Sequence, residues 1–134
     1  MRILVADDCE RIRHQMRELL ESRQGWTVCH ESADGRDAVE KAIALAPDVV
    51  LLDVRMPGLN GWEAARFVHE NLPACAILIV TNYPSSLMAG AASQAGVRGY
   101  IVKSDAARDL IPAIEAIVAR DAASSVQERQ SIEA

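Results

Sequence analysis

Residues 49–58, VVLLDVRMPG, decide the fold, because an uninterrupted apolar run ends at a carboxylate and passes directly into a turn. Apolar residues that do not alternate with polar ones are typical of a strand that is buried on both faces of a parallel sheet. Pro57 and Gly58 then mark a loop. We therefore expect Asp53 at the carboxyl end of a central strand, which is where ligands bind in open α/β folds.

Four further apolar runs lie on either side of this strand, and stretches with helical spacing separate them. The strands are expected at 3–6, 26–30, 49–52, 76–80 and 99–102. Helices are expected near 12–20, 38–46, 62–71, 84–95 and 110–118. Strands that alternate with helices predict an α/β fold with one parallel sheet covered on both faces. Right-handed crossovers favour a flavodoxin-like (βα)5 arrangement at this chain length, with strand order 2-1-3-4-5.

Two of these helices carry weaker signals than the rest. Small residues dominate 84–95, so this helix is expected to be loosely held. Pro112 would clash inside a helix. The last helix is therefore expected to start near Leu110, with Asp109 as its cap.

The composition fits one globular domain. The chain has 134 residues, of which half are hydrophobic and one quarter are charged. From residue 121 onward the sequence turns polar and loses its periodicity. We therefore predict one domain at 1–120, followed by a polar tail or linker stub at 121–134.

Charge and cysteine content narrow the function classes. A formal net charge of -5 argues against a surface that grips nucleic acid, so in a transcription factor another domain would contact the DNA. Three widely spaced cysteines indicate neither a disulfide framework nor a zinc site. No apolar run reaches membrane-spanning length, and the amino terminus reaches carboxylates too early for a signal peptide. We expect a soluble, cytoplasmic protein without membrane contact.

Polar residues follow four of the predicted strands at the point where each strand ends. They are Asp7 and Asp8, Asp53, Thr81, and Lys103. In a parallel sheet these ends share one edge, so the five side chains are expected to converge there. Three neighbouring carboxylates need protons, basic side chains or a divalent cation to offset their charge. A small set of oxygen ligands fits Mg²⁺, which keeps several waters and leaves room for a phosphate oxygen.

The same residues supply the parts that phosphoryl transfer requires. Asp53 can act as the nucleophile, since carboxylates form aspartyl phosphates. Thr81 can donate its hydroxyl and Lys103 can pair with the phosphoryl group. Each residue alone has a simpler interpretation as a helix cap, a turn residue or a solvated side chain. Their joint placement favours the functional interpretation.

Four segments at this spacing resemble the receiver domain of two-component response regulators over nearly all of residues 1–120. They are ILVADD at 3–8, VVLLDVRMPGLNG at 49–61, ILIVT at 77–81 and GYIVK at 99–103. The resemblance implies that Asp53 accepts a phosphoryl group from a sensor histidine kinase or phosphotransfer protein. It also implies that Mg²⁺ is held by Asp7, Asp8, Asp53 and the backbone carbonyl of Arg55.

The resemblance further implies a switch in which Thr81 and Lys103 bind the phosphoryl group. Thr81 then shifts and Tyr100 turns inward, although an aromatic residue on a strand is also common in cores. These movements would remodel the face formed by 84–95, 99–102 and 110–118, and the resemblance implies that a homodimer would form through the same face. Such a protein catalyses only its own phosphorylation and dephosphorylation.

The sequence departs from the receiver pattern at several positions. Asn82 stands where the family usually has a small residue, and it is expected to narrow access to Asp53. Ser104 replaces a frequent proline, so a cis peptide is not expected there. With Ser104 at this position the chain looks like the subfamily of response regulators that carries a helix-turn-helix DNA-binding domain, and this resemblance implies control of transcription. Arg55 and Tyr83 are expected to set the phosphate lifetime.

Two other functions stay open at this stage. One is a receiver-like scaffold that works without phosphorylation, which Asn82 supports and the intact acid pair opposes. The other is a haloacid-dehalogenase-like phosphatase, which also uses an aspartate nucleophile and Mg²⁺. That class expects D-x-D after the first strand, whereas Asp7 and Asp8 are adjacent.

Overall fold

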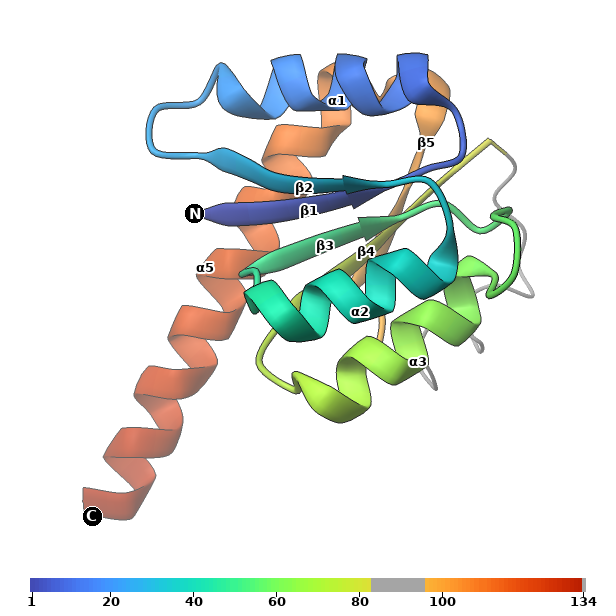
Figure 1. Ribbon diagram of the computed structural model, residues 1–134. Coiled ribbons are helices and arrows are strands. Elements are labelled where there is room, and N and C mark those ends of the chain that lie inside the picture. Colours follow the sequence, from blue (N-terminus) through green and yellow to red (C-terminus); the bar gives the residue numbers. More distant parts are fainter. Residues whose placement is uncertain (83–95, 134) are drawn as a thin grey trace.

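The computed structural model describes the backbone of residues 1–82 and 96–133, and the side chains of those residues up to 120. The helix expected at 84–95 and the modulating residue Tyr83 lie outside the described residues. The described part forms one parallel sheet with the order β2-β1-β3-β4-β5, which confirms the predicted topology (Figure 1). The strands are β1 (Arg2–Ala6), β2 (Thr27–Ser32), β3 (Val49–Leu52), β4 (Ala76–Thr81) and β5 (Gly99–Val102).

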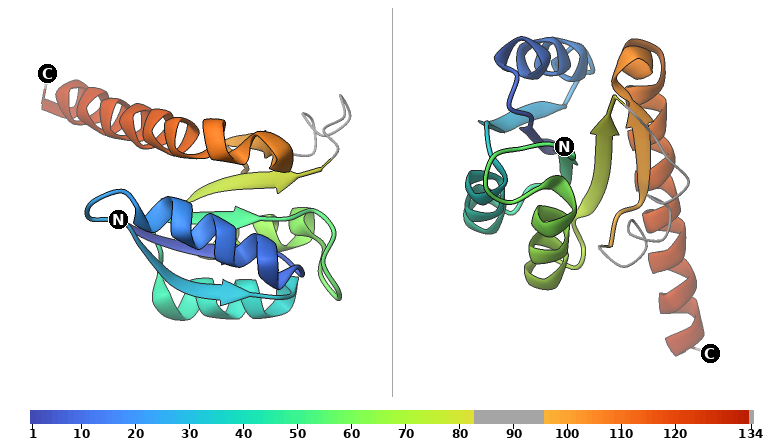
Figure 2. Two further views of the ribbon diagram at one scale, coloured as in Figure 1. Left: turned by 90° about the horizontal axis from the view of Figure 1, so that it is seen from above. Right: turned by 90° about the vertical axis from the view of Figure 1, so that its right-hand side faces the viewer.

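Helices cover both faces of this sheet. They are α1 (Glu10–Glu21), α2 (Gly35–Leu45), α3 (Gly61–Asn71) and α5 (Ala106–Glu133). One apolar cluster joins the sheet to α1 and α5, and a second cluster joins it to α2 and α3. Figure 2 shows the helices on the two faces of the sheet and the far end of α5, which projects beyond the sheet. Among the described residues, no helix is long and apolar enough to cross a membrane.

The continuous apolar runs arise because successive side chains of a strand enter opposite clusters. In β3, Val49 and Leu51 pack on the side of α1 and α5, whereas Val50 and Leu52 pack on the side of α2 and α3. All four side chains are essentially buried. The run at 49–52 is therefore apolar throughout because β3 lies in the centre of a covered sheet.

Two glycines hold the loop that follows β3. A Cβ on Gly61 would collide with the backbone carbonyl of Asp53, and one on Gly35 would collide with that of Leu59. The loop ends in a capping box, in which Asn60 Oδ1 accepts from the Glu63 amide at 2.9 Å and Glu63 Oε1 accepts from the Asn60 amide at 3.4 Å. Close packing and this cap set the path of the chain after Asp53.

The structure corrects two predicted boundaries. Strand β2 starts at Thr27 and runs to Ser32, because the amide of Trp26 instead closes a turn with the carbonyl of Arg23 at 3.1 Å. Helix α5 starts at Ala106 after a 3-10 turn at Lys103–Asp105, so Pro112 lies inside it.

The helix tolerates Pro112 because only its second turn loses a backbone hydrogen bond, while buried Leu110 and Ile114 anchor that turn to the sheet. Helix α5 continues to Glu133, through the segment assigned above to a polar tail or linker stub. The division of the chain at residue 120 stays a prediction.

Candidate functional site

The predicted polar residues meet at one edge of the sheet. Asp7 and Asp8 follow β1, Asp53 follows β3, Thr81 is the last residue of β4, and Lys103 follows β5. One carboxylate oxygen from each of the three aspartates lies within 4.8 Å of the others. The structure therefore brings together, as an acidic cluster, three residues that are separated by up to 46 positions in the sequence.

Asp7 is the most enclosed member of the cluster. It is fully buried, and its amide donates to the carbonyl of Ser32 on β2 at 3.0 Å. Its Oδ1 accepts from the amide of Cys9 at 2.9 Å. Its Oδ2 lies 2.7 Å from Lys103 Nζ. These contacts use both carboxylate oxygens and fix the Asp7 side chain between β2, the start of α1 and Lys103.

Lys103 bridges the two buried carboxylates. Its Nζ is 2.7 Å from Asp7 Oδ2 and 3.1 Å from Asp53 Oδ2. Burial opposes the charge on Lys103, but hydrogen bonds and charges from Asp7 and Asp53 outweigh it and raise the pKa of the amine above its usual value. Lys103 is therefore a fixed cation at this edge.

The surroundings of Asp53 disfavour the negative charge of its carboxylate. Burial, and after it the charge of Asp7, raises the pKa of Asp53 above the usual value for an aspartate. Hydrogen bonding and charge from Lys103 and a hydrogen bond from the Arg55 amide act in the opposite direction without cancelling the shift. Asp53 thus lies in a position where an additional cation would stabilise its charged form.

A pocket of about 450 Å³ gives access to Asp53. Asp8, Thr81 and Lys103 line it together with Asp53. Further lining residues are Cys9, Ile12, Val54, Arg55 and Asn82. Asn82 is exposed and borders the space through which a donor would approach. The pocket is large enough for a phosphoryl group and several waters.

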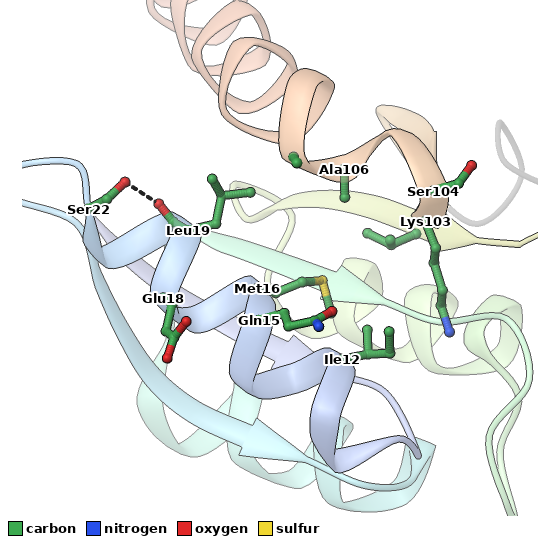
Figure 3. Close-up of a pocket in the computed structure, with 11 residues that line it drawn as sticks. Ile12, Gln15, Met16, Glu18, Leu19, Ser22, Lys103, Ser104 and Ala106 are labelled. Carbon is green, nitrogen blue, oxygen red and sulfur yellow. Dashed lines mark hydrogen bonds between the residues drawn. The ribbon is translucent and has the colours of Figure 1, made fainter.

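A second pocket of about 590 Å³ lies between α1 and α5 (Figure 3). Apolar side chains such as Ile12, Met16 and Leu19 form much of its wall. Lys103 lines both pockets, and in Figure 3 its side chain points away from α5 along the edge of this space. None of the three aspartates lines the larger pocket, whereas Asp8 and Asp53 line the smaller one.

The chemistry of the donors fits Mg²⁺. Asp8 is exposed to the pocket, while Asp7 and Asp53 are buried beside it. Only Lys103 contacts the two buried carboxylates as a cation among the described residues. Carboxylate oxygens with open space for water are the setting that Mg²⁺ prefers. Arg55 lines the same pocket, and its predicted role as a carbonyl ligand of Mg²⁺ stays a prediction.

Two predicted switch residues differ in exposure. Thr81 is buried at the end of β4, whereas Tyr100 on β5 is 54% exposed. The side chain of Tyr100 therefore lies outside the core in this structure, and its expected inward movement stays a prediction. Sequence reasoning missed that Cys9 and Ile12 line the pocket. Their positions just after the acid pair are the signal that would have found them, since Cys9 is the N-cap residue of α1 and Ile12 lies in its first turn.

Comparison with known proteins agrees with this geometry. Residues 3–115 match the response regulator receiver domain family. The chain is 32% identical over 114 residues to the transcriptional regulatory protein LnrK of Bacillus subtilis, covering 85% of this chain and 52% of LnrK. It is 35% identical over 115 residues to the response regulator UvrY of Escherichia coli, covering 86% of this chain and 53% of UvrY. The chain thus spans about half the length of these curated relatives.

A solved structure gives the same result. The crystal structure of a two-component response regulator of the LuxR family from Aurantimonas aligns with a TM-score of 0.83 and 36% identity, covering 96% of each chain. This match shows the shared fold and assigns no role to any residue of the chain. The family match over residues 3–115 is sufficient to conclude that this chain belongs to the response regulator receiver domain family.

Proposed function

We propose that this chain is a phosphorylation-controlled switch in which Asp53 accepts a phosphoryl group in a Mg²⁺-dependent reaction. The observation that carries the proposal is the position of Lys103, whose Nζ contacts both Asp7 at 2.7 Å and Asp53 at 3.1 Å. Among the residues that the structure describes, one cation, Lys103, contacts this cluster of three carboxylates, which leaves a site that favours a further cation.

In the proposed reaction, Asp53 attacks the phosphorus of a phosphohistidine on a sensor kinase or phosphotransfer protein. An O–P bond forms at Asp53, the N–P bond breaks, and the imidazole keeps the bonding electron pair. Mg²⁺ held by Asp7, Asp8, Asp53 and the Arg55 carbonyl would neutralise charge on the phosphoryl oxygens. Lys103 stays close enough to pair with the new phosphoryl group, and Thr81 lies at the end of the neighbouring strand.

The signal is proposed to pass from Thr81 to Tyr100 and then to the face that includes β5 and α5. The remaining part of this face, 84–95, lies outside the described residues. Dimerisation through this face is part of the proposal. Because the chain spans about half of LnrK, a transcriptional regulatory protein, we propose that a separate domain contacts DNA. The receiver domain itself would act in the cytoplasm, without contact with nucleic acid or membrane.

Three residues are proposed to tune the reaction. Asn82 and Arg55 line the pocket beside Asp53, so their size and charge affect access to the carboxylate. Tyr83, outside the described residues, is assigned to the same role from the sequence. Asn82 also supports a second function, a scaffold that works without phosphorylation, because a larger side chain at the pocket mouth opposes approach of a donor.

Beryllofluoride, which mimics a phosphoryl group on a carboxylate, separates these two functions. Isothermal titration calorimetry of the chain should show one bound beryllofluoride per molecule in Mg²⁺ and none after chelation. Asp53→Asn should abolish binding, and the exposed Asp48→Asn variant should retain it. Absence of binding by the unmodified protein would support the scaffold, and binding by Asp53→Asn would place the phosphoacceptor elsewhere.

A further inference from the structure

Arg13 connects helix α1 to the acidic cluster without touching a carboxylate of the cluster. Its Nη1 donates to the backbone carbonyl of Asp7 at 2.6 Å. Its Nε lies 3.4 Å from Glu31 Oε1 on β2, and both side chains are only 15% exposed. The guanidinium is therefore held between a backbone oxygen on one side and a carboxylate on the other.

The carbonyl that Arg13 contacts belongs to the peptide between Asp7 and Asp8. One residue earlier, the carbonyl of Ala6 accepts a hydrogen bond from the amide of Asp53 at 2.9 Å, which extends the pairing of β1 with β3. Beyond Ala6 the strand ends, so the Asp7 carbonyl needs a partner from outside the sheet. The charged guanidinium of Arg13 forms a stronger hydrogen bond than a neutral donor would, and this bond fixes the plane of the Asp7–Asp8 peptide.

Fixing this peptide affects both acids, because their side chains leave from the Cα atoms at its two ends. Asp7 is additionally held by Ser32 and Lys103, but no described contact other than the pocket lining engages the Asp8 side chain. The direction of Asp8 therefore depends mainly on the backbone. Arg13 supplies the one side-chain hydrogen bond to that backbone carbonyl among the described residues.

Glu31 ties Arg13 to β2 through charge, because Glu31 Oε1 lies 3.4 Å from Arg13 Nε, which makes no hydrogen bond. Its Oε2 accepts from Arg17 Nη1 at 2.8 Å, so the carboxylate is shared between two arginines. Arg17 also contacts Glu21 at 3.2 Å and the Val28 carbonyl at 3.4 Å. Arg17 thus shares the Glu31 anchor with Arg13 but bonds no atom of Asp7 or Asp8 in these contacts. Arg17 therefore serves as a matched control for Arg13.

We propose that Arg13 is a positioning residue for the Mg²⁺ site, acting by holding the Asp7–Asp8 peptide so that the Asp8 carboxylate faces the pocket while the buried Asp7 carboxylate lies beside it. This inference rests on the proposed function, since it assumes that Asp7 and Asp8 bind Mg²⁺. The simpler view is that Arg13 only ties α1 to β2. On that view, loss of Arg13 and loss of Arg17 would lower stability in the same way and leave the affinity for Mg²⁺ unchanged.

The test compares Arg13→Gln, Arg17→Gln and the unmodified chain. Calorimetry should show that Arg13→Gln weakens Mg²⁺ binding by about tenfold, as is common when a group that orients metal ligands is lost. Arg17→Gln should bind Mg²⁺ like the unmodified chain. Without metal, the amide resonances of Asp8 and Cys9 should shift in Arg13→Gln and stay in place in Arg17→Gln. Urea unfolding reports the loss of stability in each variant separately.

Several outcomes would overturn the proposal. Unchanged Mg²⁺ affinity in folded Arg13→Gln would do so, and so would equal weakening in Arg17→Gln. If Arg13→Gln does not fold, Glu31→Gln decides the matter. This variant keeps the Arg13 side chain but removes the negative charge that positions it. Its Mg²⁺ affinity should fall, and an unchanged value would overturn the proposal. Failure of the unmodified chain to bind Mg²⁺ would instead overturn the proposed function, and this inference with it.

Discussion

Replacing Lys103 with glutamine should destabilise the metal-free protein by about 3 kcal/mol at neutral pH. Lys103 is 11% exposed and lies 2.7 Å from Asp7 and 3.1 Å from Asp53, whose side chains are 0% and 8% exposed. Removing one partner from a buried ion pair costs about 3–5 kcal/mol, because the remaining charge is left uncompensated. We expect the lower end, since Asp53 borders the pocket and can take up a proton.

Urea unfolding followed by circular dichroism measures this loss, and in heating experiments it corresponds to a fall in Tm of about 10 °C. Saturating Mg²⁺ should recover part of the stability, because the metal replaces the missing cation. The deficit should also shrink as the pH falls, since protonation of Asp53 removes one of the opposing charges. The exposed Lys41→Gln variant is the control and should behave like the unmodified chain. A Lys103→Gln variant as stable as that control, without metal at neutral pH, would refute the reasoning.

Three further predictions concern the same edge of the sheet. Asp53→Asn should stabilise the metal-free protein at neutral pH, as measured by urea unfolding. Because the pKa of Asp53 is raised in the folded protein, the contribution of Asp53 to the free energy of unfolding is present at low pH and is lost as the pH rises through that pKa. Equal stability of the variant and the unmodified chain at neutral pH would contradict this. Gly61→Ala should cost about 2 kcal/mol or more in the same assay, since its Cβ would collide with the Asp53 carbonyl. Asn82→Ala should accelerate phosphorylation by acetyl phosphate several-fold, and an unchanged rate would show that Asn82 does not restrict access.

The fold could be predicted because each strand carries its own signal. The four-residue run at 49–52 is apolar at every position, and this pattern has few explanations other than a covered parallel strand. The convergence of Asp7, Asp53 and Lys103 followed from topology alone, because parallel strands place their carboxyl ends at one edge. Neither conclusion required any knowledge of side-chain contacts.

Other features depend on tertiary contacts and were beyond sequence reasoning. Pro112 suggested that helix α5 starts late, but packing of Leu110 and Ile114 outweighs the lost hydrogen bond. Arg13 is one of three arginines at positions 11–17, and sequence spacing does not single it out. Its hydrogen bond to the Asp7 carbonyl depends on how α1 lies on the sheet, and sequence spacing does not encode that orientation.

Mass spectrometry after incubation with acetyl phosphate tests the central claim most directly. The account predicts that one phosphoryl group is added per chain in Mg²⁺, that peptide mapping locates it on Asp53, and that chelation of the metal prevents it. Asp8→Asn should react more slowly, because a metal ligand is lost while the nucleophile remains. Phosphorylation of the Asp53→Asn variant to the same extent, or no phosphorylation of the unmodified chain in Mg²⁺, would contradict the account.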